Sequence, residues 1–329
     1  MGRIAVTDGM DEIAVKHLEK MGHEVVLQHY TADELASGVL SSFDAVVIRS
    51  ATKMTEQVIN NSSGRNGQLK LIGRAGVGID NIDLAVSTSS RIVVCNTPDA
   101  STHAVVELTI GHLLACARHI TTGDRTLRDG EWAKRKLRGT ELSGKRLGLI
   151  GFGRIAQGVG KVARSLGMTL HTYDPYLVAE VAADQHCQLH DEIDEVFRLC
   201  THISIHCNLT EETHHLVNTE RLEMMPGIGI DGVPCGNHIV NCARGGIVDE
   251  VALLKALESG MVATAALDVF EKGSAVDNPI IHHRNFHGSP HIGAATIEAQ
   301  ARIGKEMSAL LIDFFDGKKP TTIINPEIY

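Results

Sequence analysis

GLIGFGRIAQG, residues 148–158, has the pattern of a glycine-rich turn between a strand and a helix. Gly151, Gly153 and Ala156 stand at the spacing G-x-G-x-x-A. In this pattern the first glycine makes the tight turn, the second lets a pyrophosphate approach the backbone, and the small third residue lets the helix pack closely on the strand. The start of the helix offers N–H groups to the phosphates. The stretch therefore predicts a dinucleotide-binding turn.

A carboxylate stands at the end of the next predicted strand. The run LHTYD ends in Asp174, which follows Gly151 at about the 20-residue spacing at which a carboxylate binds the ribose hydroxyls. The next residues are Pro, Tyr and Leu, so no cation follows for the additional phosphate of NADP. This favours NAD over NADP.

A second glycine-rich stretch, GRAGVGIDN at residues 73–81, fails the same test. It has Gly76 and Gly78, but Asn81 stands where a small residue is required, and the next strand ends in VVCN without an acid. These glycines therefore need a different role.

Short β-branched runs alternate with helical patterns along almost the whole chain. The runs are continuous, as is typical of parallel strands buried on both faces. They occupy residues 3–8, 24–28, 44–50, 70–76, 91–96, 146–151, 170–174, 202–207, 238–243 and 264–270. Because 329 residues exceed the usual size of one core, we expect two α/β domains. A helix-rich stretch at 101–125 joins them, and a final helix within 296–320 returns to the first.

Composition excludes several classes of protein. With 43% hydrophobic and 22% charged residues, the chain resembles a soluble globular protein, and no run of about 18 apolar residues is present. The first residues lack the apolar core of a signal peptide, so a cytosolic location is expected. The net charge of −9 disfavours a nucleic-acid surface. Seven cysteines without a C-x-x-C pair indicate reduced, mostly buried thiols.

A histidine-rich segment near the C-terminus raises the question of a metal site. His283, His287 and His291 have the spacing that would place them on one helix face. Gly288 and Pro290 lie within that window, and a proline breaks the helix that such a site needs. We therefore expect no metal ion.

Motifs spread over nearly the whole chain resemble the D-isomer-specific 2-hydroxyacid dehydrogenases, most closely their phosphoglycerate dehydrogenase branch. The motifs are RSATKMT (49–55), GRAGVGIDNID (73–83), ELTIGHLLACAR (107–118), GTELSGKRLGLIGFGRI (139–155), NCARGGIVDE (241–250), AALDVFE (265–271) and SPHIGAAT (289–296). The resemblance implies a doubly wound Rossmann NAD-binding domain, residues 102–294. This domain is inserted into a discontinuous flavodoxin-like α/β substrate domain, residues 1–101 and 295–329, with the active site in the cleft between them.

The resemblance also implies roles for individual residues. Arg244 would bind the substrate carboxylate and polarise the reacting carbonyl, for which a guanidinium fork is well suited. His291 would be the general acid and base, because histidine titrates near neutrality. Asp268 would hold the nicotinamide carboxamide, and the backbone amides of residues 76–78 would receive the carboxylate. The implied cofactor-binding residues are Gly151, Gly153, Arg154, Ile155, Asp174, Cys207, Cys242, Ala243, Asp268 and Gly293; the implied substrate-binding residues are Arg49, Ser50, Lys53, Gly76, Val77 and Gly78.

Basic residues decide the expected substrate. Arg49 and Lys53, together with the charged run at 134–138, could neutralise a substrate phosphate, although such a run is more often a solvated face. The leading expectation is NAD-dependent oxidation of D-3-phosphoglycerate to 3-phosphohydroxypyruvate, the first step of serine synthesis. The alternatives are a hydroxypyruvate or glyoxylate reductase, and a catalytically impaired NAD-sensing protein. Relatives form dimers through the Rossmann domain and the arm at 119–140, so we expect a homodimer or a dimer-based tetramer.

Three positions depart from the family pattern. Gly273 stands where the glutamate that orients the catalytic histidine is expected, and Glu271 is the nearest carboxylate, which makes it the candidate replacement. The segment PGIGIDGVPCGN before His238 is longer than usual, by about nine residues counted from the motif spacing. Asn208 replaces a proline. From the end at Tyr329 we expect the form without a C-terminal regulatory domain.

Overall fold

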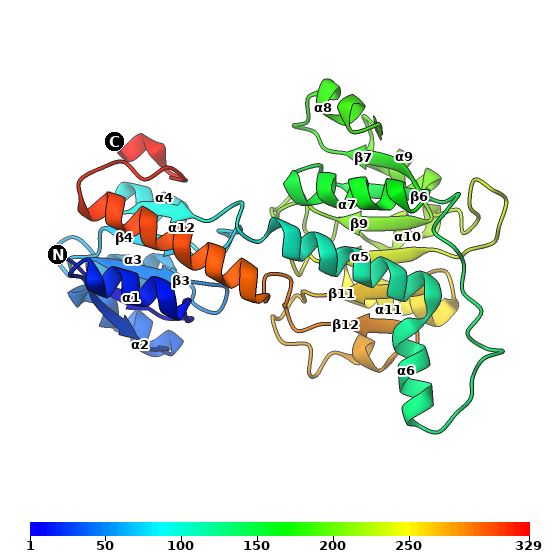
Figure 1. Cartoon of the computed structure of the whole chain (residues 1–329), viewed down its shortest axis with the longest axis horizontal. Helices are drawn as coiled ribbons and strands as arrows, with labels where there is room; N and C mark the ends of the chain where they lie inside the picture. The colour runs from blue at the N-terminus through cyan, green and yellow to red at the C-terminus, as the bar shows by residue number, and fades with distance from the viewer. The chain divides into compact units, whose positions relative to one another are not determined.

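A computed structural model describes all 329 residues, and the chain divides into two compact units (Figure 1). Residues 1–101 and 294–329 form unit 1, and residues 102–293 form unit 2. The second break follows Gly293, one residue earlier than the sequence motifs suggested. No helix is both long enough and apolar enough to cross a membrane. No group of three or more His, Cys, Asp or Glu side chains is arranged to hold a metal ion.

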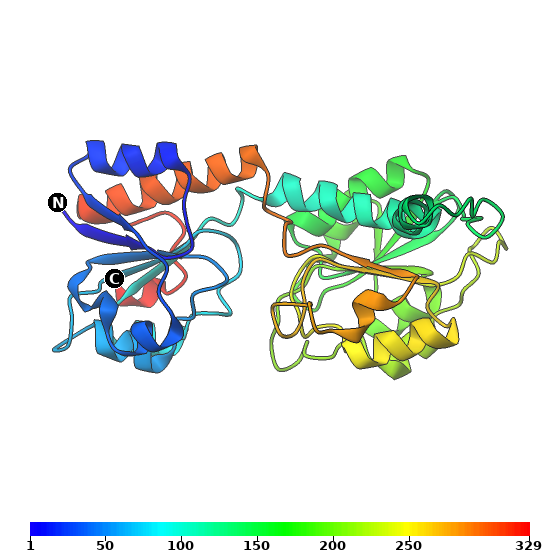
Figure 2. The same cartoon turned by 90° about the horizontal axis from the view of Figure 1, so that it is seen from below.

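Unit 1 is a five-stranded parallel sheet in the order β2-β1-β3-β4-β5, which is the flavodoxin-like order. Figure 2 shows α1 and α12 on one face, and α2, α3 and α4 on the other. The strands are β1 (Arg3–Val6), β2 (Glu24–Leu27), β3 (Ala45–Ile48), β4 (Leu71–Arg74) and β5 (Val93–Asn96). The helices are α1 (Glu12–Lys20), α2 (Ala32–Ala36), α3 (Glu56–Ser62), α4 (Leu84–Ser89) and α12 (Ile297–Phe315), with short 3-10 turns at Val39–Ser42 and Pro326–Ile328.

Unit 2 is a seven-stranded parallel sheet in the order β12-β11-β10-β9-β6-β7-β8, the doubly wound Rossmann order with one further strand. One apolar core packs α5 and α7 on the sheet, and a second packs α9, α10 and α11 on the opposite face. The strands are β6 (Arg146–Ile150), β7 (Thr169–Tyr173), β8 (Cys187–Leu189), β9 (His202–Ile205), β10 (His238–Asn241), β11 (Thr264–Leu267) and β12 (Phe286–Gly288). The helices are α5 (Thr102–Arg118), α6 (Ile120–Arg128), α7 (Arg154–Ser165), α8 (Ala179–Asp184), α9 (Ile193–Leu199), α10 (Thr219–Met224) and α11 (Glu250–Ser259), with a 3-10 turn at Pro279–His282.

The predicted α/β class and both sheet types are confirmed. The final helix α12 packs against α1 within unit 1, because its buried face contributes Ile303, Met307 and Leu311 to that core. The helix-rich stretch after Ser101 consists of two helices rather than one. His119 separates α5 from α6 with a left-handed φ of 54°, a conformation that ends a helix.

Candidate active site

The glycine turn lies at the carboxyl end of β6, where ligands collect in open α/β sheets. Gly151 has a φ of +85°, and a Cβ there would lie 3.0 Å from the backbone nitrogen of Cys207. The turn therefore requires glycine for both its conformation and its closeness to the neighbouring strand end. Gly153 is the N-cap of α7, no side chain caps this helix, and a Cβ at Gly153 would meet nothing within 4 Å. The start of α7 is thus open to an anionic ligand.

Asp174 is fixed in place beside this turn. Its Oδ2 accepts a hydrogen bond from the Phe152 N–H at 2.9 Å, and its Oδ1 accepts one from the Tyr176 N–H at 3.0 Å. The carboxylate helps to line a cavity of about 350 Å³, together with the glycine turn and Cys207. This volume lies in the range of small-ligand pockets. The cavity, the turn and the carboxylate together fit the adenosine half of a dinucleotide.

The other predicted cofactor residues of unit 2 lie in the turn and at the ends of neighbouring strands. Ile155, in the first turn of α7, and Cys242, after β10, both pack against the apolar core under α5 and α7. Burial raises the pKa of the Cys207 thiol to about 11 and that of Cys242 to about 12. Both thiols are therefore neutral, so these residues offer shape rather than charge.

The loop after β10 holds Arg244 in a fixed backbone conformation. The Asn241 Nδ2 donates to the Arg244 carbonyl at 2.8 Å, and the Asn241 Oδ1 accepts from the Ala243 N–H at 2.9 Å. The Arg244 Nη1 donates to the Ala243 carbonyl at 2.6 Å. Asn241 itself is buried, at 1% exposure. A buried amide that satisfies both ends of this short loop sets the direction in which Arg244 leaves the backbone.

Asp268 organises the segment that carries His291. Its Oδ1 accepts from the Ser289 hydroxyl at 2.6 Å and from the Ile292 N–H at 2.8 Å, and its Oδ2 accepts from the Gly293 N–H at 2.9 Å. The Asp268 side chain is buried, at 1% exposure. His291 stands between these donors, and its own N–H donates to the Asp268 carbonyl at 2.8 Å. A buried carboxylate with three donors fixes the loop firmly; its predicted contact with a carboxamide stays a prediction.

The backbone at His291 is in the left-handed region, with a φ of 53°. Residues other than glycine adopt this conformation uncommonly, and they do so where surrounding contacts enforce it. The contacts of Asp268 with the residues on both sides of His291 supply that enforcement. The His112 Nε2 adds a further contact with the Ser289 hydroxyl oxygen, at 3.1 Å.

The Glu271 carboxylate, the candidate replacement for the missing glutamate, is paired with His215 in this structure. The Glu271 Oε1 accepts from the His215 Nε2 at 2.8 Å, and the Glu271 N–H donates to the Glu250 Oε1 at 2.8 Å. The loop after β11 thus brings this carboxylate to His215, and a role of Glu271 at His291 stays a prediction. Gly273, the other position in question, has a φ of +76°. A Gly273→Glu substitution would therefore strain the backbone, by about 1–2 kcal/mol, although nothing lies within 4 Å of the added Cβ.

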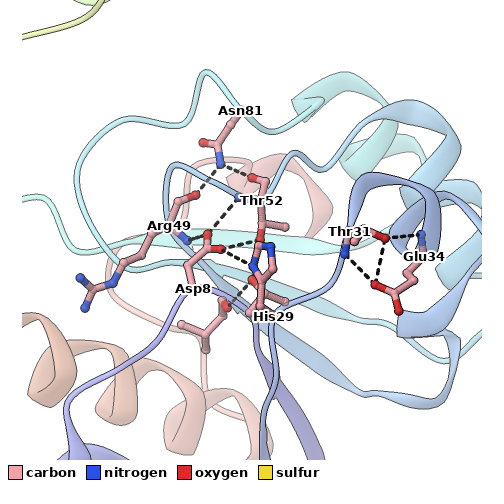
Figure 3. Close-up of polar contacts among 9 residues, drawn as sticks. Asp8, His29, Thr31, Glu34, Arg49, Thr52 and Asn81 are labelled. Atoms are coloured by element: carbon pink, nitrogen blue, oxygen red, sulfur yellow. Dashed lines mark hydrogen bonds and ion pairs between the residues drawn. The ribbon is translucent and has the colours of Figure 1, made fainter. Parts of the chain in front are cut away.

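In unit 1, the predicted substrate loop at residues 49–53 is held from both sides (Figure 3). The Asp8 Oδ2 accepts from the N–H groups of Arg49 at 2.7 Å and Thr52 at 3.0 Å, and its Oδ1 accepts from the Thr52 hydroxyl at 2.8 Å. The Asn81 Nδ2 donates to the carbonyls of Arg49 at 2.7 Å and Thr52 at 2.6 Å. Asn81 therefore has a structural role in the second glycine-rich stretch, which the sequence left unexplained.

The Arg49 guanidinium points away from this network, as Figure 3 shows. Its Nε is buried and has no hydrogen-bond partner in the chain. Burial lowers the pKa of Arg49, and the nearby Asp8 opposes that effect. A buried guanidinium nitrogen without a partner is costly, which indicates that an anion completes the site.

The other predicted substrate-binding residues also belong to unit 1. Ser50 accepts a hydrogen bond at its hydroxyl from the Arg74 Nη2 at 2.9 Å, and Lys53 is exposed. The Val77 carbonyl accepts from the Asn96 Nδ2 at 2.7 Å, and the Gly76 carbonyl from the Thr97 N–H at 3.1 Å. These bonds use the carbonyls of residues 76–77 on the side of β5, so the loop itself is well defined.

Comparisons with known proteins agree with this arrangement. Residues 110–293 match a family model described as the D-isomer-specific 2-hydroxyacid dehydrogenase, NAD-binding domain. The chain is 42% identical over 325 residues to a D-3-phosphoglycerate dehydrogenase of Methanocaldococcus jannaschii, covering 99% of this chain and 60% of that one. It is 43% identical over 309 residues to a hydroxypyruvate reductase of Thermotoga maritima, covering 93% and 95%. A solved structure of a Thermus thermophilus protein superposes with a TM-score of 0.85 at 29% identity, covering 98% and 99%.

The chain belongs to the D-isomer-specific 2-hydroxyacid dehydrogenases. Unit 2 contains the NAD-binding domain of that family. The chain spans 60% of the length of the Methanocaldococcus phosphoglycerate dehydrogenase and 58% of that of the rat enzyme.

Several residues that hold these segments in place within each unit were not predicted from the sequence. Asp8 and Asn81 hold the loop at 49–53, and Ser289 and His112 support the segment around His291. The only signal for Asp8 in the sequence is its position at the end of a predicted strand, and Asn81 stands out only as a mismatch in a glycine pattern. Ser289 stood inside a recognised motif, where its hydroxyl could have been considered as a partner of Asp268.

Proposed function

We propose that this chain is an NAD-dependent dehydrogenase that oxidises D-3-phosphoglycerate to 3-phosphohydroxypyruvate. The observation that carries the proposal is the buried Asp268 carboxylate, which holds the segment on both sides of His291 through three donors. A fixed histidine and a fixed arginine loop in the NAD-binding unit supply the acid–base and electrostatic groups that oxidation of a hydroxy acid requires.

The residues present fit NAD. The open start of α7 and the glycine turn suit the pyrophosphate, and Asp174 suits the adenosine ribose. When bound, NAD accepts the hydride that leaves C2 of the substrate. The chain's own residues have to bind the acid, orient C2 and remove the hydroxyl proton.

In this mechanism His291 takes the proton from the C2 hydroxyl as the carbonyl forms. Arg244 holds the carboxylate and stabilises the negative charge on the C2 oxygen, since a guanidinium cannot lose its charge near neutral pH. Asp268 keeps His291 in position. In the reverse direction His291 returns the proton to the carbonyl oxygen.

Arg49 and Lys53 favour a phosphorylated substrate. Arg49 has a buried nitrogen without a partner, and Lys53 is an exposed cation four residues later on the same fixed loop. A dianionic phosphate is well matched to such a pair. The second candidate is a hydroxypyruvate reductase, which is favoured by the 43% identity to the Thermotoga enzyme over 95% of its length.

Steady-state kinetics of variants in the loop at 49–53 distinguish the phosphoglycerate dehydrogenase from the hydroxypyruvate reductase. Arg49→Gln and Lys53→Gln are expected to raise KM for D-3-phosphoglycerate by about 10-fold or more, since a charged hydrogen bond contributes about 1.5–3 kcal/mol. KM for D-glycerate, which lacks the phosphate, should change little. Arg65→Gln, which removes an exposed cation elsewhere in unit 1, is the matched control. Equal effects on both substrates, or none on either, would argue against phosphate recognition by this loop.

Asp174 is expected to set the choice of cofactor. Its carboxylate is held beside the glycine turn by two backbone N–H groups. In the proposed ribose-binding role it would repel the 2′-phosphate of NADP. Asp174→Ala should raise KM for NAD and narrow the ratio of kcat/KM between NAD and NADP by about 10-fold, corresponding to ~1.4 kcal/mol. Measurement of kcat/KM with NAD and with NADP, for the wild type and the variant, checks this prediction. An unchanged ratio would show that Asp174 does not set the choice of cofactor.

We also propose a cytoplasmic homodimer joined through the arm at 119–140. Ile120, Leu127 and Trp132 are exposed by 56%, 59% and 81%, so apolar side chains gather on the arm within one chain. Lys136 pairs with Glu131 at 2.7 Å, so at least this cation of the charged run is already engaged on the surface. Exposed apolar groups of this kind are typical of a surface covered by a partner.

A further inference from the structure

A second cavity of unit 2 lies at the amino ends of β6, β7 and β8, the opposite end of the sheet from the glycine turn. It has a volume of about 360 Å³ and involves no residue of the proposed cofactor site. No carboxylate lines it, and most of its polar side chains are cationic or basic: Arg146, Arg164, Thr169, His171, His186 and Gln188. In a chain with a net charge of −9, a cavity of this composition is unusual.

The two arginines differ in the contacts that their guanidinium groups already make within the chain. Arg164 lies in the last turn of α7, where a cation stabilises the helix dipole, and its Nη1 donates to the Gln185 carbonyl at 3.2 Å. Arg146 begins β6, is partly buried, and its guanidinium makes no hydrogen bond or ion pair within the chain. A partly buried guanidinium without a carboxylate indicates that a ligand supplies the negative charge.

A chain of hydrogen bonds fixes the ring of His171, one of the two histidines in this cavity. The Glu195 Oε2 lies 3.0 Å from the His190 Nδ1, and the His190 Nε2 lies 2.9 Å from the His171 Nδ1. Because the ionised carboxylate only accepts, His190 donates from Nδ1 and accepts at Nε2 from the His171 Nδ1–H. Burial, with smaller effects of His190 and Arg146, lowers the pKa of His171 to about 4. The neutral ring therefore keeps an acceptor nitrogen at Nε2.

The unusual segment before β10 contributes one residue to the lining of the cavity. Ile230, from this segment, is among the lining residues. Its neighbour Asp231 pairs through Oδ2 with the Nζ of Lys145 at 2.6 Å, and the Lys145 side chain is only 2% exposed. The hairpin is closed by the Gly229 N–H, which donates to the Val233 carbonyl at 2.9 Å. The segment is thus anchored to Lys145, the residue that precedes Arg146.

We propose that this cavity binds a phosphate group, of inorganic phosphate or of a small phosphate ester. The guanidinium groups of Arg146 and Arg164 pair with its charged oxygens, and the His171 Nε2 accepts from its remaining hydroxyl. The volume fits a ligand at the small end of the usual range. This site is separate from the proposed catalytic function and does not depend on it.

Thermal unfolding of the full chain tests the proposal. The probe is inorganic phosphate, compared with sodium chloride at equal ionic strength and with NADH present throughout to fill the cofactor site. We expect phosphate to raise Tm saturably, by about 2–4 °C when it is in roughly tenfold excess over its Kd. Glycerol 2-phosphate in a parallel titration separates the two sources, since the preferred ligand reaches half of its effect at the lower concentration.

Variants locate the effect. The double variant Arg146→Gln, Arg164→Gln should lose the phosphate increment, while Lys161→Gln, which removes an exposed cation one turn earlier on α7, should keep it. Should the double variant not fold, Arg146→Gln alone suffices, because that guanidinium makes no hydrogen bond or ion pair within the chain that the substitution would remove. A wild-type chain that gains nothing beyond the salt effect, or Arg146→Gln with the full increment, would overturn the proposal.

Discussion

Replacing His291 by asparagine is expected to lower kcat for D-3-phosphoglycerate oxidation by about 10²–10⁴-fold, the usual contribution of a positioned acid–base group. Asparagine is among the few residues that adopt the left-handed conformation readily, so it can occupy the position where φ is 53°. The backbone N–H that donates to the Asp268 carbonyl is also retained. The variant therefore removes the proton acceptor with little expected change in the loop.

Steady-state kinetics and NADH titration together check this prediction. KM for NAD and the Kd for NADH should stay within about twofold, because the imidazole is assigned to proton transfer and not to cofactor binding. His282→Asn, in an exposed position of the same unit, is the matched control and should retain wild-type kcat. A His291→Asn variant with more than a tenth of wild-type kcat would show that another group takes the proton.

Acidification is expected to destabilise unit 2 strongly between pH 6.5 and 5. Burial lowers the pKa of His171, His238 and His287 to about 4 and that of His206 to about 3. The rings of His202 and His238 are also stacked, with centroids 4.4 Å apart, and burial together with His238 lowers the pKa of His202 well below its usual value. The folded unit thus keeps several neutral imidazoles in its interior.

The direction in which stability changes with pH follows from proton uptake by the unfolded chain. Below pH 6.5 the unfolded chain protonates these histidines while the folded chain does not, so the unfolded state binds more protons. Stability from each group is therefore fully present above about pH 6.5 and falls as pH decreases toward the folded-state pKa. For a pKa of about 4, each group costs about 2 kcal/mol at pH 5 relative to neutrality, from 1.36 kcal/mol per pKa unit. The summed cost of several such groups is comparable to the free energy of unfolding of a whole domain.

Urea unfolding midpoints between pH 7.5 and 5 measure this effect. We expect a steep fall in the wild-type chain and the same fall in His103→Asn, which removes an exposed histidine of α5. Replacing buried His238 by asparagine should lower stability at pH 7.5 and make the pH dependence shallower. A midpoint that stays constant from pH 7.5 to 5.5 would contradict the assignment of neutral buried rings.

Much of the fold follows from local sequence, because its strongest signals are short. The turn at 148–158 and Asp174 lie within one strand–helix–strand unit, so spacing alone places them together. Continuous apolar runs predicted both parallel sheets. The position of His119 between α5 and α6 was not predictable in this way, since a non-glycine residue in a left-handed conformation carries no local sequence signal.

The site was less predictable where distant side chains meet. Asp8 bonds to Arg49 across 41 positions, and only the parallel pairing of β1 with β3 brings them together. Glu271 was judged by its nearness in sequence to the expected glutamate position, whereas the fold places His215, 56 positions away, at its carboxylate. Spacing within a motif identifies residue types for a reaction; the partners of each side chain depend on the register of the sheet.

Initial rates with D-3-phosphoglycerate test the central claim most directly. The full chain should form NADH from NAD and D-3-phosphoglycerate with a kcat/KM at least tenfold above that with D-glycerate, and in the reverse direction should reduce 3-phosphohydroxypyruvate in preference to hydroxypyruvate. Turnover with NADP should be much slower, since the Asp174 carboxylate, in its proposed role at the adenosine ribose, would repel the 2′-phosphate. Higher kcat/KM with the unphosphorylated acids would contradict the phosphoglycerate assignment, and absence of NADH formation with every hydroxy acid would contradict the dehydrogenase itself.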